Sequence, residues 1–242
     1  MKRPVALYMV FIALLIFVFF LLNLLLGSVS IPFKEVWQIL WGNSHENEIA
    51  YNIIWKSRIP QALTALVAGA GLSVSGLQMQ TVFRNPLADP SVLGVSSGAS
   101  LGVAFVVLLS GAVGGVALSH LGYLGEVALS LAAIVGAMSV MALIVYVSMK
   151  VRGNVTLLII GVMIGYVANA IIGVLKFFSV EEDIRAYVIW GLGSFARVSG
   201  DQMLLFVGIM AVLLPLSFLL IKTMNLLLLG NGYARNLGLN IR

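Results

Sequence analysis

The chain has 242 residues, of which 61% are hydrophobic and 10% charged, with a net charge of +5. A soluble domain is about 45–50% apolar and about 25% charged, so this composition argues against a soluble enzyme, a nucleic-acid-binding protein and a disordered chain. The chain has no cysteine, which excludes disulfides and thiolate metal sites. We expect an all-α protein that crosses a membrane several times and holds neither a metal ion nor a cofactor.

Six apolar segments are long enough to cross a bilayer, because a hydrocarbon core about 30 Å thick needs about 20 helical residues. They cover residues 5–26, 61–83, 92–110, 126–149, 155–178 and 203–222. The first segment is longer than a signal-peptide core and has no clear cleavage site, so we expect a retained helix. Residues 1–222 would form the membrane domain, and residues 223–242 would form a cytoplasmic segment.

The charged residues indicate which ends of the spans face the cytoplasm. With the N-terminus inside and the spans alternating, the inside regions hold eight basic residues and one acid, whereas the outside regions hold six basic residues and eight acids. The inside therefore carries +7 and the outside −2, in keeping with the basic character of cytoplasmic loops. Six spans return the C-terminus to the inside, so we expect both termini in the cytoplasm.

Small side chains are concentrated in residues 61–83 and 92–110. They allow helix backbones to pack tightly, and a translocation path between packed helices would need the same residues. The candidates for lining such a path are Ser73, Gln78, Gln80, Ser96, Ser97 and Ser100. No acidic or basic residue lies deep within a span, which argues against proton-coupled transport. The chain also lacks a Walker A motif, so an ATP-driven motor would have to be a separate subunit.

The outside loop 27–60 contains the aromatic residues Phe33, Trp37, Trp41 and Trp55. Aromatic side chains with a polar edge suit the membrane–water boundary. The proline at position 32 and the apolar spacing that follows it predict a short interfacial helix up to Trp41.

Three segments combine residues in an unusual way. The first runs from Arg58-Ile59-Pro60 through Gly69-Ala70-Gly71-Leu72 to Arg84-Asn85-Pro86-Leu87-Ala88-Asp89-Pro90 and Leu93-Gly94-Val95-Ser96-Ser97-Gly98-Ala99. The second is Trp190-Gly191-Leu192-Gly193-Ser194-Phe195, and the third comprises Leu229-Gly230, Ala234-Arg235 and Leu237-Gly238-Leu239. Together they closely resemble the permease subunit of the ABC importers for iron–siderophores, haem and cobalamin.

The resemblance covers almost the whole chain and implies a particular assembly. Two permease copies would pair in the bacterial inner membrane, bind cytoplasmic ATPase subunits, and receive substrate from a periplasmic binding protein. Family permeases have about ten spans, so this chain looks like the first six spans and the start of a cytoplasmic connection. Two residues depart from the family pattern, namely Gln61 in place of an arginine and Asn231 in place of an acid.

The resemblance also assigns roles to three groups of residues, each with a simpler structural alternative. Arg58 would dock the binding protein, or it would extend its charged end to the membrane interface in the ordinary way. The cytoplasmic turn Arg84, Asn85, Pro86, Asp89 and Pro90 would contact the ATPase, or it would only link two spans. The coupling residues Leu229, Gly230, Ala234, Arg235, Leu237 and Gly238 would lie on two short helices in a cleft of the ATPase, or that segment would be an interfacial anchor.

Two functions are therefore expected from the sequence. The leading one is a transport subunit of an ATP-driven importer for an iron chelate, haem or cobalamin. The alternative is a non-transporting or inactive half-length membrane protein. The candidate path offers no charged ligand that would identify the substrate.

Overall fold

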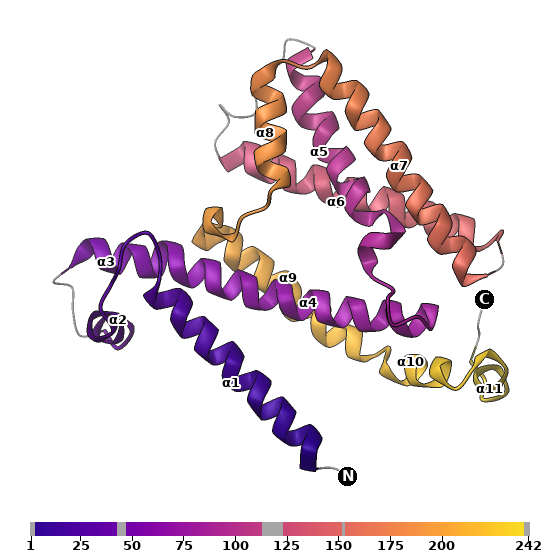
Figure 1. The fold of residues 1–242 in the computed structure, drawn as a ribbon, viewed down its shortest axis with the longest axis horizontal. Helices are drawn as coiled ribbons and strands as arrows, with labels where there is room; N and C mark the ends of the chain where they lie inside the picture. Colours follow the sequence, from indigo (N-terminus) through magenta and orange to yellow (C-terminus); the bar gives the residue numbers. More distant parts are fainter. Residues whose placement is uncertain (1–2, 43–46, 113–122, 152, 240–242) are drawn as a thin grey trace. The chain divides into compact units, whose positions relative to one another are not determined.

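The computed structural model describes residues 3–42, 47–112, 123–151 and 153–239, and every regular element in these ranges is a helix (Figure 1). Five helices are long and apolar enough to cross a membrane, judged by length and composition: Val5–Leu25, Glu48–Phe83, Gly125–Ser148, Val155–Phe178 and Gly200–Phe218. A sixth apolar helix, Val95–Leu109, is shorter. The expected all-α membrane fold is confirmed.

The predicted spans, given to within a few residues, differ from the helix ends by three to four residues at the third and sixth spans. The third span begins at Val95 rather than at residue 92, because residues Pro90–Leu93 form the 3-10 helix η2, which ends at Gly94 with φ +76°. The sixth span is α9, Gly200–Phe218, and it ends four residues before the predicted residue 222. The amide of Leu220 bonds to the carbonyl of Ser217 at 3.1 Å, which closes a turn before the next helix.

The chain divides into two compact units, which we describe separately. The first comprises Met1–Gly71 and Ser194–Leu216, and the second comprises Leu72–Gly193 and Ser217–Arg242. The first contains α1 (Arg3–Leu25), α2 (Phe33–Leu40), α3 (Glu48–Ile53), the π-helical turn η1 (Ile54–Arg58) and η4 (Phe195–Arg197). The second contains η2, α5 (Val95–Ala112), α6 (Tyr123–Ser148), α7 (Asn154–Phe178), α8 (Glu181–Gly191), α10 (Ile221–Leu228) and α11 (Asn231–Asn236). Helices α4 (Ile59–Phe83) and α9 run from one unit into the other.

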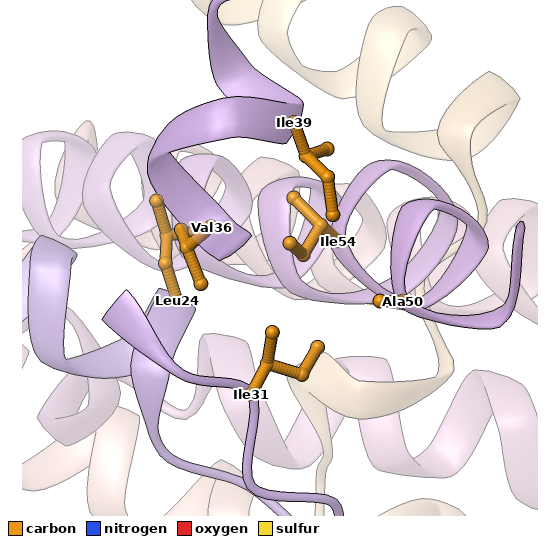
Figure 2. Close-up of a cluster of buried hydrophobic side chains, with 6 residues drawn as sticks. All are labelled: Leu24, Ile31, Val36, Ile39, Ala50 and Ile54. Atoms are coloured by element: carbon orange, nitrogen blue, oxygen red, sulfur yellow. The ribbon is translucent and has the colours of Figure 1, made fainter. Parts of the chain in front are cut away.

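The core of the first unit lies where α2 packs against the end of α1 and the start of the long helix Glu48–Phe83. Its buried side chains come from four separate segments (Figure 2): Leu24, Ile31, Val36, Ile39, Ala50 and Ile54. Asn47 caps α3 by accepting a hydrogen bond from the amide of Ala50, and its amide group donates to Glu35 of α2 at 2.8 Å. The rest of α1 is exposed apolar surface, as expected for a helix that faces lipid.

The second unit is organised around α5, which contacts α6, α7 and α8 (Figure 1). One hydrophobic cluster joins the C-terminal half of α5 to α7 and α8, and it includes Val103, Val107, Ile172 and Tyr187. Ser179, just after α7, donates to the carbonyl of Leu108 at 3.0 Å. These contacts hold α8, an 11-residue helix, against α5.

Candidate functional site

Glycines set the spacing between α5 and α6. A Cβ at Gly102 would lie 2.2 Å from the carbonyl oxygen of Ala132, and a Cβ at Gly136 would lie 2.2 Å from that of Gly98. Both distances are far too short for any side chain, so the two backbones are in direct contact at these points. The glycines at 98 and 102 are therefore used for helix packing, which is the simpler of the two explanations for the small residues of this span.

The candidate path residues lie on two helices. On α4, Ser73 and Gln80 are exposed and Gln78 is half-buried. On α5, Ser96 is exposed, whereas Ser97 and Ser100 are half-buried. The hydroxyl oxygen of Ser97 faces α7, because it lies 3.2 Å from the position of a Cβ on Gly165. A single path shared by the two groups stays a prediction.

The segment between α4 and α5 is a tightly hydrogen-bonded turn. Helix α4 ends in a Schellman motif, in which the amide of Asn85 bonds to the carbonyl of Gln80 at 3.1 Å and the amide of Arg84 bonds to that of Thr81 at 3.3 Å. Arg84 occupies the left-handed position of this motif with φ +49°, the only non-glycine residue in the described ranges with a positive φ. Glycine is the usual residue there, because a Cβ is disfavoured in this conformation.

Polar side chains complete the turn. The side-chain oxygen of Asn85 accepts from the amide of Leu87 at 2.9 Å, and that of Asp89 accepts from the amide of Ser91 at 2.7 Å. Asp89 thereby caps η2, whose first residue is Pro90. Hydrogen bonds from the side chain and backbone of Ser91 lower the pKa of Asp89 below its ordinary value. The two prolines and two Asx side chains thus form the turn that the sequence predicts.

The predicted coupling segment consists of two short helices, α10 and α11, separated by Gly230 with φ +107°. Helix α11 also ends in a Schellman motif, with Gly238 at φ +86° as its left-handed residue and a bond from the amide of Leu239 to the carbonyl of Ala234 at 3.0 Å. Arg235 is exposed, and so are the apolar side chains of Leu229, Tyr233 and Leu237.

Ala234 is the buried member of the predicted coupling residues. The sequence suggests that its small side chain allows close approach to a partner, but it is fully buried within the chain. A bulky residue at this position would therefore disturb the chain's own packing before it met a partner. The exposed apolar residues that could contact a partner include Leu228, Leu229, Tyr233 and Leu237.

The turn and the coupling segment meet although they are far apart in the sequence. The guanidinium of Arg84 donates from Nη2 to the backbone carbonyl of Leu227, near the end of α10, at 3.0 Å. Both residues belong to the second unit. Nothing in the sequence of either motif indicates that they share a hydrogen bond.

Arg58 belongs to the first unit and is only 5% exposed. Its guanidinium donates to the backbone carbonyls of Leu24 and Val29, at the end of α1 and in the loop after it. A buried guanidinium with two carbonyl partners favours a structural role over the docking or interfacial roles considered from the sequence. Docking through Arg58 stays a prediction.

Asp183 lies in the first turn of α8, and from the sequence it is only one of the eight acids expected outside. It is 8% exposed, and its Oδ2 has no hydrogen-bond partner among the described residues. Burial, together with the neighbouring charge of Glu182, raises the pKa of Asp183 above its ordinary value. The run Glu181-Glu182-Asp183 indicates a helix start, but it does not show which of the three acids is buried.

Apolar helices of spanning length, followed by a two-helix segment after the last of them, are the architecture of a polytopic helical membrane protein. The chain belongs to the FecCD transport family, whose profile matches residues 14–242.

Curated relatives agree with this family. The chain is 31% identical over 218 residues to the hemin transport system permease protein HmuU of Yersinia pestis, covering 90% of this chain and 62% of the relative. It is 35% identical over 213 residues to the vitamin B12 import system permease protein BtuC of Serratia proteamaculans, covering 88% of this chain and 60% of that protein. A Helicobacter pylori protein named as an iron chelatin transport system permease is 37% identical over 228 residues, covering 90% of this chain and 64% of the relative. The chain therefore spans a little under two thirds of their length.

A solved inward-facing structure, described as a metal-chelate type ABC transporter, has the same fold. It matches 95% of this chain and 67% of its own, with a TM-score of 0.76 and 27% sequence identity.

Proposed function

We propose that the chain is a transmembrane subunit of an ATP-driven importer in the bacterial inner membrane. The substrate class is an iron chelate or a related metal macrocycle such as haem or cobalamin, the compounds named for its relatives. The chain itself is not an enzyme in this proposal, and a separate cytoplasmic ATPase hydrolyses ATP. A periplasmic binding protein delivers the substrate, and a second permease copy completes the path.

The observation that carries the proposal is the exposed apolar surface of the coupling segment. Leu229, Tyr233 and Leu237 are 59%, 71% and 61% exposed although they follow the last described span. A short helix pair with several large exposed apolar side chains suits a docking surface, because exposed apolar patches mark interaction sites. An interfacial anchor would use the same residues, so the test must separate lipid from protein.

Co-purification with the ATPase provides that test. We expect Leu237→Asp to weaken retention of the ATPase by about tenfold, because it places a charge in an apolar contact. The matched control is Asn236→Asp, which adds the same charge one residue away at another exposed position. Normal retention with Leu237→Asp, combined with loss of the segment from vesicle surfaces, would favour the anchor and contradict the coupling role.

Uptake by proteoliposomes tests the substrate class. Vesicles that contain the permease, the ATPase and the binding protein should accumulate one of three labelled compounds, a ferric siderophore, haem or cobalamin, only when ATP is supplied. Uptake of none of them would favour the non-transporting alternative.

The orientation of the chain is part of the same proposal, and it rests on the split of +7 inside against −2 outside. Because the chain has no cysteine, single cysteines can be introduced at the exposed positions Leu87 and Lys56. We expect an impermeant thiol reagent to label Lys56→Cys, but not Leu87→Cys, in cells whose outer membrane has been made permeable. The reverse pattern would overturn the orientation.

A further inference from the structure

The conformation of Arg84 is costly for any residue other than glycine. It occupies the left-handed position at the end of α4 with φ +49°, where glycine would avoid the steric conflict of a Cβ. Such a backbone conformation persists only where the surrounding structure holds it, and it is common at functional positions. The side chain of Arg84 does make a specific contact, its bond to the carbonyl of Leu227.

The acceptor of this bond is well suited to a cation. The carbonyl of Leu227 is among the last of α10, where helix carbonyls lack a partner within the helix and carry partial negative charge. It also accepts a hydrogen bond from the amide of Gly230 at 3.1 Å, at the junction between α10 and α11. Arg84 is therefore bonded to the junction of the two coupling helices.

On the other side of this contact, Arg84 belongs to a tightly hydrogen-bonded turn. The Schellman motif at Arg84, the Asn85 turn and the Asp89 cap hold residues 84–94 in one conformation. At the far end, a Cβ on Gly94 would lie 2.8 Å from the carbonyl oxygen of Gly161, so the turn is packed directly against α7. Hydrogen bonds and direct packing therefore connect Arg84 to α4, α5 and α7.

We infer that Arg84 is a positioning residue whose hydrogen bond links the cytoplasmic turn to α10. Through this link, movement of the coupling helices α10 and α11 would also move α4 and α5, the spans that end and begin at this turn. The inference rests on the proposed function and identifies one route within it. Glycine at position 84 would keep the backbone of the turn and remove the hydrogen bond to Leu227.

Two measurements test the inference on the full chain. The first is pulsed electron paramagnetic resonance between spin labels at Leu87→Cys and Leu228→Cys, which are exposed positions on the turn and on α10. We expect Arg84→Gly to broaden the distance distribution between the labels. The second is the ratio of substrate transported to ATP hydrolysed in the assembled importer, which we expect to fall by about threefold to tenfold, the range for one ordinary hydrogen bond.

Control variants separate loss of the bond between Arg84 and Leu227 from the general effect of removing a positive charge. Lys150→Gln removes an exposed cation at the end of α6 and should leave both measurements unchanged. Arg84→Lys keeps the charge and should retain part of the transport ratio. An unchanged distance distribution or an unchanged transport ratio in Arg84→Gly, with the ATPase still bound, would overturn this inference but not the proposed function. Failure of the unmodified chain to retain the ATPase would overturn the proposed function and the coupling role together.

Discussion

The guanidinium of Arg58 donates to the backbone carbonyl of Leu24, which precedes it by 34 residues and lies at the end of α1. A second bond reaches the carbonyl of Val29 in the following loop. Arg58 thereby satisfies two carbonyls beside the hydrophobic cluster of Figure 2. It lies in the last position of the π-helical turn η1, where the amide of Ile59 bonds back to Ile54.

Arg58→Ala should therefore destabilise the first unit. We expect a loss of about 2 kcal/mol in the free energy of unfolding, because two partly buried carbonyls lose a charged donor. Thermal unfolding of the purified protein in detergent measures this, and Lys56→Ala is the matched control because Lys56 is exposed on the same turn. Equal stability of the two variants, with slower binding-protein association only for Arg58→Ala, would restore the docking role.

The contact between α5 and α6 should not tolerate a single added methyl group at its glycines. Gly102→Ala would place a Cβ 2.2 Å from the carbonyl oxygen of Ala132, so the helices must separate. We expect destabilisation of about 1–3 kcal/mol, typical of overpacking. Gly173→Ala on α7 is the control, because a Cβ there has no neighbour within 4 Å. Folded yield after extraction compares the two, and similar yields would contradict the observed packing.

Helix α2 should lie at the membrane–water interface. It has three sectors: Val36 and Ile39 are buried, Lys34 and Gln38 form a polar side, and Phe33, Trp37 and Trp41 form an exposed aromatic row with ring centroids 6.2 and 5.5 Å apart. An apolar sector beside a polar one suits a helix lying in the plane of the interface.

Tryptophan fluorescence tests this placement. A variant that keeps only Trp37, with Trp41, Trp55 and Trp190 changed to Phe, should be quenched more by lipids brominated near the headgroup than by lipids brominated at the chain end. The matched variant that keeps only Trp190, which is partly buried in the second unit, should be quenched less. If neither lipid quenches Trp37, the aromatic row of α2 does not contact lipid, and the interfacial placement is wrong.

The buried carboxylate of Asp183 should lower the free energy of unfolding at neutral pH. Its pKa is raised by burial, so the folded state binds the proton more tightly than the unfolded chain, and stability falls as pH rises through the ordinary range of an aspartate. Asp183→Asn should therefore stabilise the protein by about 1 kcal/mol at neutral pH, the scale of one buried polar group. The gain should shrink as pH falls towards about 4, near the ordinary aspartate pKa.

Thermal unfolding at the two pH values measures this dependence. The control is Glu181→Gln, which removes the same charge from an exposed position in the same helical turn. A gain that does not depend on pH would show that ionisation of Asp183 is not the cause.

The sequence alone was enough to identify the helices and the family. A segment that crosses the hydrocarbon core needs about 20 apolar residues in a helix. This requirement applies to each segment by itself, so it can be recognised in the sequence. The turn between α4 and α5 was also predictable, because Pro86 and Pro90 act on the residues directly before them. The start of α5 was misplaced because the 3-10 helix that follows Asp89 continues the apolar pattern of the span.

Other features depend on which segments meet in three dimensions. An arginine guanidinium can donate equally well to a lipid headgroup, a partner protein or a backbone carbonyl. Only the tertiary structure therefore shows that Arg58 bonds to Leu24 and Arg84 to Leu227. Burial of Ala234 and Asp183 likewise follows from neighbours distant in the sequence. Composition and periodicity describe what one segment can form, whereas the contacts between segments depend on packing that only the folded chain defines.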